Sequence, residues 1–203
     1  MSRDEWYLRS SWSCRRLQRD LVYREAKKGS RILDIGTGMG RTVNSLSRSG
    51  KSVVGVDIDP RLLAEARKIN RRVAYIRASA LHLPFKAGSF DEVILENVIE
   101  HIREQGKVIE ETRRVLDDGG RLIISTPNKY IYRFFMYLRK IRDLEFDRGW
   151  LGNPVPGHVA ELTPGGLRRL LTGFREHRIR GINPYVKSED PRVGIDLLAV
   201  AVK

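Results

Sequence analysis

The feature that most constrains the fold is a repeated alternation of short apolar runs with longer amphipathic segments. The runs predict strands, because they are brief, rich in Val and Ile, and bounded by Gly or charged residues. The segments predict helices, because apolar residues recur in them at helical spacing. Five predicted strands occupy residues 31–36, 52–59, 73–79, 90–97 and 119–127, and three predicted helices lie between them at 41–50, 60–70 and 104–116.

This alternation is typical of βαβ units and predicts an α/β fold with a doubly wound, mostly parallel, Rossmann-like sheet and helices on both faces. A helix capped by Thr163 follows, and two final strands at 177–186 and 193–203 are expected to pair antiparallel at the edge. The sheet would then have seven strands and an antiparallel edge strand. In such sheets ligands bind at the carboxyl ends of the strands. The loops expected to carry the chemistry are those after Ile35, Val56, Arg77, Leu95 and Ser125.

Length and composition suit a single domain over residues 1–203, since 203 residues at 41% hydrophobic content can bury a core. Residues 1–28 are predicted to be a helical lead-in, and residues 129–160 an insert that covers the site or binds the acceptor. We expect a cytoplasmic location, because no apolar run is long enough for a membrane span or a signal peptide. The one cysteine, Cys14, excludes internal disulfides and a cysteine zinc cage.

The net charge of +13 favours anionic partners, which are nucleic acid, an acidic membrane surface or a phosphorylated substrate. A basic surface without a partner fits the same number. Charge alone does not separate these alternatives.

The stretch ILDIGTGMG, residues 32–40, joins the first predicted strand to the first helix through Gly36, Gly38 and Gly40. A dinucleotide-binding turn needs its third glycine where Arg41 stands, and the G-K-[ST] of a P-loop is missing. Asp34 directly precedes the turn. A carboxylate there would repel a pyrophosphate and would suit a ligand with a positive charge.

Asp57 ends the second predicted strand, about 20 residues after the glycines, where an acid accepts hydrogen bonds from ribose hydroxyls. A nucleoside without phosphates, with a cationic group near Asp34, describes S-adenosylmethionine.

Four motifs in order and spacing carry a family resemblance. ILDIGTGMG, VVGVDIDP, LHLPFKAGSFDEVILENVIEHI and GGRLIISTPN resemble class I S-adenosylmethionine-dependent methyltransferases, in particular the type 11 and ubiquinone-biosynthesis O-methyltransferase kinds. The match covers residues 31–128, about half of the chain. The resemblance implies methyl transfer from S-adenosylmethionine as the activity.

The resemblance also implies how the donor is held. The glycines let the backbone approach the methionyl and ribose portions, Asp57 binds the ribose diol, and Ile58 packs on the adenine. Ser79 stands where the family usually has an Asp that accepts from the adenine amino group, and a serine hydroxyl accepts a hydrogen bond more weakly than a carboxylate does. The residues expected to bind the donor are Asp34, Gly36, Thr37, Gly38, Gly40, Asp57, Ile58, Ser79, Ala80, Leu81 and Glu96.

For catalysis, His101 is the candidate general base, because imidazole titrates in the useful range and the residue follows the fourth strand. The alternative is a histidine that packs within its loop. No metal site is predicted, since the spacing of Glu96, Glu100 and His101 is unlike a tight metal motif. His158 either faces the acceptor or has a structural role, whereas His82 and His177 are interpreted as loop and surface residues.

Residues 129–142 hold five basic residues and no acid. As a helix they would present an apolar stripe that fits a membrane interface, a lid over an apolar acceptor, or the core. The stripe consists of Ile131, Phe134, Phe135, Leu138 and Ile141. We therefore expect a small, apolar or lipid-like acceptor, methylated on oxygen or carbon, with possible contact to an anionic membrane. RNA methylation and a non-catalytic binding module are the alternatives.

Overall fold

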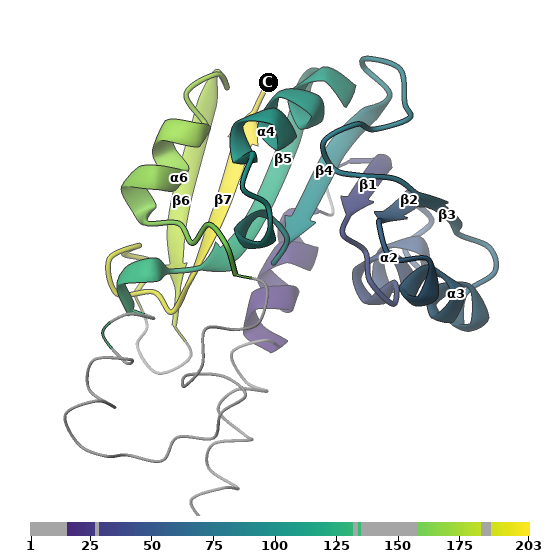
Figure 1. Cartoon of the computed structure of the whole chain (residues 1–203), viewed down its shortest axis with the longest axis horizontal. Coiled ribbons are helices and arrows are strands. Elements are labelled where there is room, and N and C mark those ends of the chain that lie inside the picture. Colours follow the sequence, from purple (N-terminus) through teal and green to yellow (C-terminus); the bar gives the residue numbers. More distant parts are fainter. Residues whose placement is uncertain (1–15, 27–28, 132–133, 135–157, 184–187) are drawn as a thin grey trace, which may run out of the picture.

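The computed structural model describes residues 16–26, 29–131, 134, 158–183 and 188–203. Its described residues form a seven-stranded sheet in the order β3-β2-β1-β4-β5-β7-β6 (Figure 1). The strands are β1 (Arg31–Ile35), β2 (Ser52–Asp57), β3 (Ala74–Arg77), β4 (Phe90–Glu96), β5 (Leu116–Pro127), β6 (Glu176–Ile182) and β7 (Asp196–Val202). β1 to β5 are parallel, while β7 pairs antiparallel with both β5 and β6. The predicted mostly parallel sheet with an antiparallel edge is confirmed.

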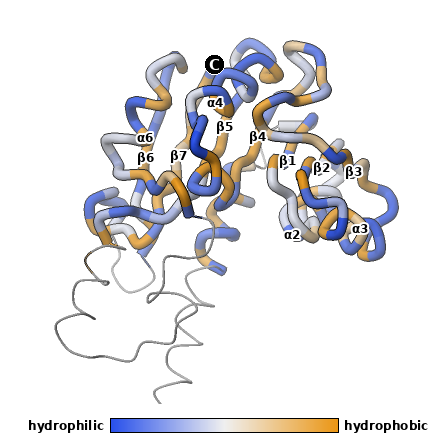
Figure 2. The backbone as a smooth tube through the Cα atoms, in the orientation of Figure 1, coloured by the Kyte–Doolittle hydropathy of each residue, from blue (hydrophilic) through white to orange (hydrophobic). Residues whose placement is uncertain are grey.

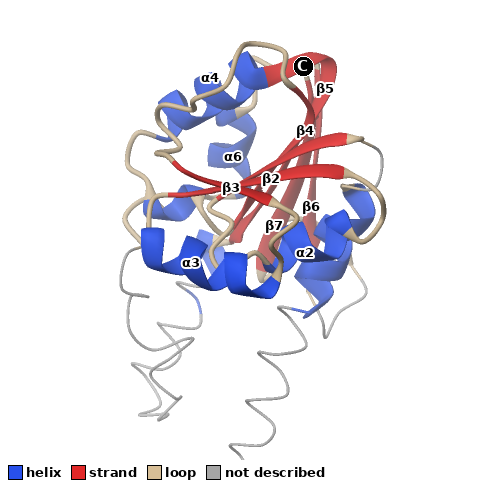
Figure 3. Cartoon of the chain, turned by 90° about the vertical axis from the view of Figure 1, so that its right-hand side faces the viewer, coloured by secondary structure: helices blue, strands red, loops and turns tan. Residues whose placement is uncertain are grey.

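The helices cover both faces of this sheet, as the alternation predicted. They are the N-terminal helix (residues 16–25), α2 (Arg41–Ser47), α3 (Pro60–Ile69), α4 (Gln105–Val115) and α6 (Pro164–Leu170), with a 3-10 turn η1 (Ile99–His101) after β4. Figure 3 shows α4 and α6 on one side of the strands and α2 and α3 on the other. No helix among these residues combines the length and the apolar character that crossing a membrane would need.

Side chains of the central strands alternate between two cores, because successive residues of a strand point to opposite faces. In β5, Leu122 and Ile124 join the core beneath α4 and α6. Ile123 joins the core beneath the N-terminal helix, α2 and α3. The middle parts of these strands are therefore largely apolar, with orange stretches in Figure 2, as expected of a sheet that is covered on both faces.

Two helix starts follow from local chemistry. The side chain of Asp59 accepts from the backbone nitrogen of Arg61 at 2.8 Å, and Pro60 takes the first position of α3. Thr163 caps α6 in the same way, with its Oγ1 accepting from the Gly166 nitrogen at 3.0 Å. Both caps satisfy backbone donors that a helix start leaves open, so the predicted boundary at Thr163 is confirmed.

The N-terminal helix lies within residues 1–28, for which a helical lead-in was predicted. Val22 and Ala26 are fully buried, and Leu17 and Leu21 pack beside them. Trp6, Trp12 and Cys14 lie outside the described residues. Glu25 fixes the end of this helix to β5 through an ion pair with Arg121 at 2.9 Å.

β5 differs from its prediction at its start. The strand was predicted to begin at residue 119, but it begins three residues earlier, at Leu116. The register shifts between Phe90 and Glu92 of β4, and Gly119 has a positive φ of 78°. The glycine pair thus makes an irregularity within the strand, which glycine tolerates because it lacks a Cβ.

The insert at 129–160 cannot be compared as a whole, because only residues 129–131, Phe134 and 158–160 of it are described. Residues 129–131 are helical and Phe134 is exposed. The predicted lid, membrane helix or core helix over 129–142 otherwise lies outside the described residues.

The order of the strands fixes where a ligand can sit. β1 lies between β2 and β4, and the chain reaches β4 only after crossing back from β3 at the edge. This reversal is a topological switch point, where open parallel sheets bind ligands at the carboxyl ends of the strands.

Candidate functional site

The glycine turn after β1 has a backbone that only glycine adopts easily. Gly36, Gly38 and Gly40 all have positive φ, at 72°, 54° and 74°. A Cβ at Gly36 would collide with Cγ2 of Val98, whereas a Cβ at Gly38 would meet nothing within 4 Å. The first glycine therefore permits close packing and the second faces open space.

The turn is fixed to the end of β2. The backbone nitrogens of Gly36 and Thr37 donate to the Val56 oxygen at 2.7 and 2.9 Å. The backbone nitrogen of Gly38 donates to Asp57 Oδ2 at 2.9 Å, and that of Asp59 donates to Asp57 Oδ1 at 2.9 Å. Both carboxylate oxygens can accept further hydrogen bonds, so Asp57 is oriented while keeping the capacity to bind a ligand.

Asp34 is a buried acid at the base of the turn. Burial, with smaller contributions from the carboxylates of Glu96 and Asp57, raises the pKa of Asp34 to about 8. Three acids thus gather at the carboxyl ends of β1, β2 and β4. A cationic ligand would stabilise the ionised forms of these acids, whereas they would repel a pyrophosphate.

Ile58 stands next to Asp57 with 67% of its surface exposed. Its carbonyl accepts from Arg77 Nε at 3.2 Å, which joins the ends of β2 and β3. An exposed isoleucine beside an oriented carboxylate gives an apolar surface that a flat ring could cover.

Ser79, which follows β3, forms two hydrogen bonds within its own loop. Its hydroxyl accepts from the Leu81 nitrogen at 3.2 Å, and its carbonyl accepts from the His82 nitrogen at 3.1 Å. These bonds shape the loop that contains Ala80 and Leu81. The Ser79 side chain is therefore already engaged as an acceptor.

The end of β4 is held by two polar contacts that the sequence did not indicate. Thr42, in the first turn of α2, donates to Glu96 Oε2 at 2.6 Å. The buried Gln18 of the N-terminal helix donates to Asn97 Oδ1 at 2.9 Å. An isolated glutamine in an amphipathic helix has no sequence signal that would identify it as buried.

The 3-10 turn η1 places Glu100 and His101 just past β4. Glu100 is buried, and burial raises its pKa to about 7. The exposed ring of His101 lies 4.9 Å, between centroids, from the ring of His158, which comes from the segment before α6. Burial and the neighbouring His101 lower the pKa of His158. His82 and His177 do not join this cluster.

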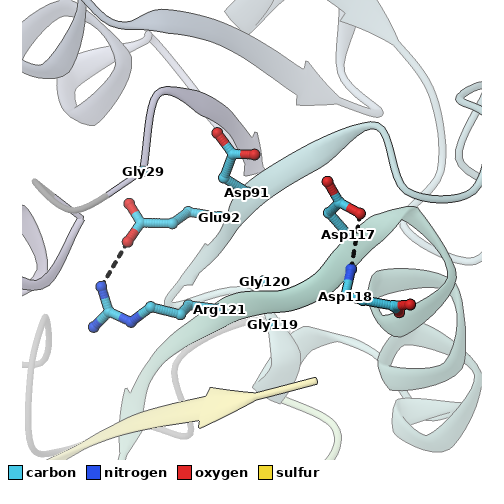
Figure 4. Close-up of a pocket in the computed structure, with 8 residues that line it drawn as sticks. All are labelled: Gly29, Asp91, Glu92, Asp117, Asp118, Gly119, Gly120 and Arg121. Carbon is cyan, nitrogen blue, oxygen red and sulfur yellow. Dashed lines mark hydrogen bonds and ion pairs between the residues drawn. The ribbon is translucent and has the colours of Figure 1, made fainter.

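A concavity lies at the amino-terminal end of the strands, opposite the glycine turn (Figure 4). It encloses about 200 Å³ and is lined mainly by the starts of β4 and β5. Its acids have basic partners: Glu92 pairs with Arg121 at 2.6 Å, and Asp91 and Asp117 pair with Arg31. The acidic side chains of this hollow therefore form ion pairs that join neighbouring strands.

The known proteins that this chain is similar to are methyltransferases. The profile of the methyltransferase domain matches residues 33–124. A demethylmenaquinone methyltransferase of Tropheryma whipplei (strain Twist) is 33% identical over 119 residues, 56% of this chain and 50% of that protein. A probable S-adenosylmethionine-dependent methyltransferase of Mycobacterium tuberculosis (strain ATCC 25618 / H37Rv) is 30% identical over 168 residues, 80% of this chain and 56% of that protein. The chain spans about half the length of these relatives.

Among solved structures, an S-adenosylmethionine-dependent methyltransferase of Thermotoga maritima, described as a possible histamine N-methyltransferase, has a TM-score of 0.72. The match covers 98% of this chain and 95% of that chain at 22% identity. At this identity the likeness concerns the fold.

Proposed function

We propose that this chain is a class I S-adenosylmethionine-dependent methyltransferase, which its similarity to the methyltransferase domain and to methyltransferase relatives supports, and that it transfers the donor's methyl group to a small, apolar or lipid-like acceptor. The observation that carries the proposal is the joined pair of Gly38 and Asp57. A glycine turn with open space above it is hydrogen-bonded to the acid at the end of the next strand.

The described residues fit the nucleoside half of the donor. Both ribose hydroxyls can donate to Asp57. Each of its two oxygens already accepts from one backbone nitrogen, which fixes the orientation of the carboxylate. The adenine would cover the exposed Ile58 and lie against the loop of Ala80 and Leu81. Because Ser79 already accepts from Leu81, we propose that backbone groups of this loop, rather than the serine hydroxyl, read the adenine.

The charge of the site fits the methionine half. Asp34 lies near Glu96 and Asp57, and its raised pKa reflects mainly the cost of burying a charge and, to a smaller degree, repulsion from these two carboxylates. A sulfonium and an ammonium brought near these acids would favour their ionised forms. We propose that Asp34 orders the turn around the ammonium and that the Glu96 carbonyl contacts the methionine portion.

The bound donor would supply an activated methyl group on a sulfonium. The protein's part is then to align the acceptor with this methyl and to exclude water. η1 follows β4 directly, so His101 stands at the edge where an acceptor would approach. If the acceptor must lose a proton, His101 is the side chain that we propose to act on it.

Two observations support an apolar acceptor and methylation on oxygen or carbon. Tyr130 and Phe134, which follow the carboxyl end of β5, expose 59% and 55% of their surface. One relative is a demethylmenaquinone methyltransferase.

We include in this proposal peripheral contact of residues 129–142 with anionic membranes and the expected cytoplasmic location. Cell fractionation tests both.

RNA is the second candidate acceptor, and the net charge of +13 is the observation that favours it. Electrostatic binding to RNA would weaken steeply as the salt concentration rises, whereas burial of an apolar acceptor would not.

The test is methyl transfer from a donor labelled in the transferred methyl group. The purified chain is offered short-chain quinols, a lipid extract and total RNA in separate reactions. We expect label in the quinol or lipid fraction. Label confined to RNA would replace the acceptor class, and donor binding without transfer to any pool would favour a non-catalytic module.

A further inference from the structure

Three metal-ligating side chains from two separate segments meet beside the proposed donor site. Glu100 and His101 come from η1, and His158 comes from the segment that leads to α6. One ligand atom from each lies within 4.8 Å of the other two. The two imidazole rings meet edge to face, with an interplanar angle of 71°.

Backbone hydrogen bonds fix the distance between these two segments. The nitrogens of Val159 and Ala160 both donate to the Glu100 carbonyl, at 2.9 and 3.1 Å. Gln105 Nε2 adds bonds to the carbonyls of Ile99 and Ala160, at 2.9 and 2.6 Å. The fold itself therefore brings the three side chains together.

Glu100 gives a second, independent observation. Only 1% of the residue is exposed, and its Oε2 accepts from Thr126 Oγ1 at 3.1 Å. Its Oε1 is buried and has no hydrogen-bond partner among the described residues. A buried carboxylate oxygen without a donor is unfavourable, and a bound cation would satisfy it.

We propose that Glu100, His101 and His158 bind one divalent transition-metal ion. Two imidazole nitrogens and one carboxylate oxygen are a donor set that suits Zn²⁺, Mn²⁺, Fe²⁺ or Co²⁺, whereas Ca²⁺ and Mg²⁺ prefer oxygen ligands throughout. Three protein ligands leave coordination positions open, as in metal sites that act on a substrate.

Glu161 lies beside His158, next to the three proposed ligands. Its Oε1 lies 3.7 Å from Nδ1 of His158, which is beyond hydrogen-bond distance. We take Nε2 as the nitrogen that would face a metal, because a small rotation of the His158 ring would bring Nδ1 to this carboxylate. Metal-binding histidines are commonly oriented by a carboxylate on the other ring nitrogen.

The use of the metal rests on the proposed function, although its binding does not. The ion would sit past β4, at the edge where the acceptor approaches the donor. An acceptor hydroxyl that takes an open position would lose its proton to solvent water more readily, because the cation stabilises the oxyanion. His101 would then be a ligand and not a general base.

Metal binding is tested on the untagged full chain after treatment with a chelator. Zn²⁺ and Mn²⁺ are titrated by calorimetry, and Co²⁺ is followed by visible absorption. We expect one ion per chain, and at least about tenfold weaker binding for His101→Ala, His158→Ala and Glu100→Gln. The control His177→Ala removes a histidine from β6 and should bind as the wild type does.

Absence of saturable binding, or wild-type affinity in His158→Ala, would overturn the metal site. Thermal unfolding without metal identifies a variant that fails to fold, and the remaining variants then decide. Donor titration of the metal-free chain keeps the two proposals separate. Failure to bind S-adenosylmethionine would count against the proposed function and would leave the metal result standing.

Discussion

The side-chain amides of Gln18 and Asn97 form a reciprocal pair of hydrogen bonds. Gln18 Nε2 donates to Asn97 Oδ1 at 2.9 Å, and Asn97 Nδ2 donates to Gln18 Oε1 at 3.4 Å. Gln18 is only 2% exposed, and Asn97 has a positive φ of 53° directly after β4. The N-terminal helix therefore fixes the turn from which the candidate catalytic residues follow.

Replacement of Gln18 by alanine should destabilise the fold and weaken donor binding. Loss of the pair leaves the Asn97 amide without its partner, at a cost of about 1–3 kcal/mol in the free energy of unfolding. Urea unfolding measures this cost. Asp20→Ala, at an exposed position of the same helix, should stay within about 0.5 kcal/mol of the wild type. Equal stability of the two variants would contradict the role of the pair.

Gly36→Ala should be destabilised by strain and by collision. Its positive φ costs an alanine about 1–2 kcal/mol. Its Cβ also meets Val98, which adds about 1–3 kcal/mol. Gly50→Ala is the matched control, because Gly50 has φ of 76° but open space around its Cβ position. The difference between the two variants in urea unfolding isolates the collision.

The collision can be checked further by a second substitution. Val98→Ala removes the colliding methyl, so the double variant should recover part of the stability lost in Gly36→Ala. Purely additive effects would show that the strain lies elsewhere.

Stability of the ligand-free protein should fall as the pH rises toward 8. Unfolded Asp34 ionises near its ordinary pKa of 3.8, whereas the folded group stays protonated up to about 8. The folded state binds more protons in this window, so the free energy of unfolding decreases with pH by up to about 1.4 kcal/mol per unit. Asp34→Asn should make this slope shallower by the share that Asp34 contributes, while Glu100, whose pKa burial raises to about 7, keeps a slope of the same sign below pH 7. Urea unfolding between about pH 5.5 and about pH 7.5 measures both slopes.

Asp59→Asn serves as the control for the slope. Hydrogen bonds from Arg61 lower the pKa of Asp59 to about 2, so this group is ionised in both states across the window. The control should keep the wild-type slope. A flat wild-type profile would refute the account of Asp34.

Phe134→Glu should reduce flotation of the protein with anionic vesicles, because it puts a charge on an exposed aromatic side chain after β5. Ile69→Glu is the matched control: Ile69 ends α3 and is 62% exposed. If both variants float like the wild type, residues near 134 do not contact the membrane.

The sequence located the residues proposed to bind the donor through local patterns, and the structure places them at neighbouring strand ends. Asp34, Gly36 and Asp57 were located by their positions at strand ends. Parallel pairing followed from the alternation of strands and helices, whereas the order of the strands in the sheet was not predicted. The observed hydrogen bond between Gly38 and Asp57 joins two motifs that the sequence had linked only by spacing.

Long-range contacts account for what the sequence did not predict. Gln18 meets Asn97, and His158 meets Glu100, across distances along the chain that no periodic pattern encodes. The raised pKa of Asp34 likewise depends on burial, which a carboxylate in an apolar run indicates only once its surroundings are known.

Calorimetric titration with S-adenosylmethionine and S-adenosylhomocysteine measures directly whether the edge formed by Gly38 and Asp57 binds the donor. We expect one donor per chain and affinity about ten- to a hundredfold weaker in Asp57→Ala, equivalent to about 1–3 kcal/mol. Asp118→Ala, at the opposite end of the strands, should bind like the wild type. No binding of either ligand, or unchanged affinity in Asp57→Ala, would contradict the assignment of this edge of the sheet as the donor site.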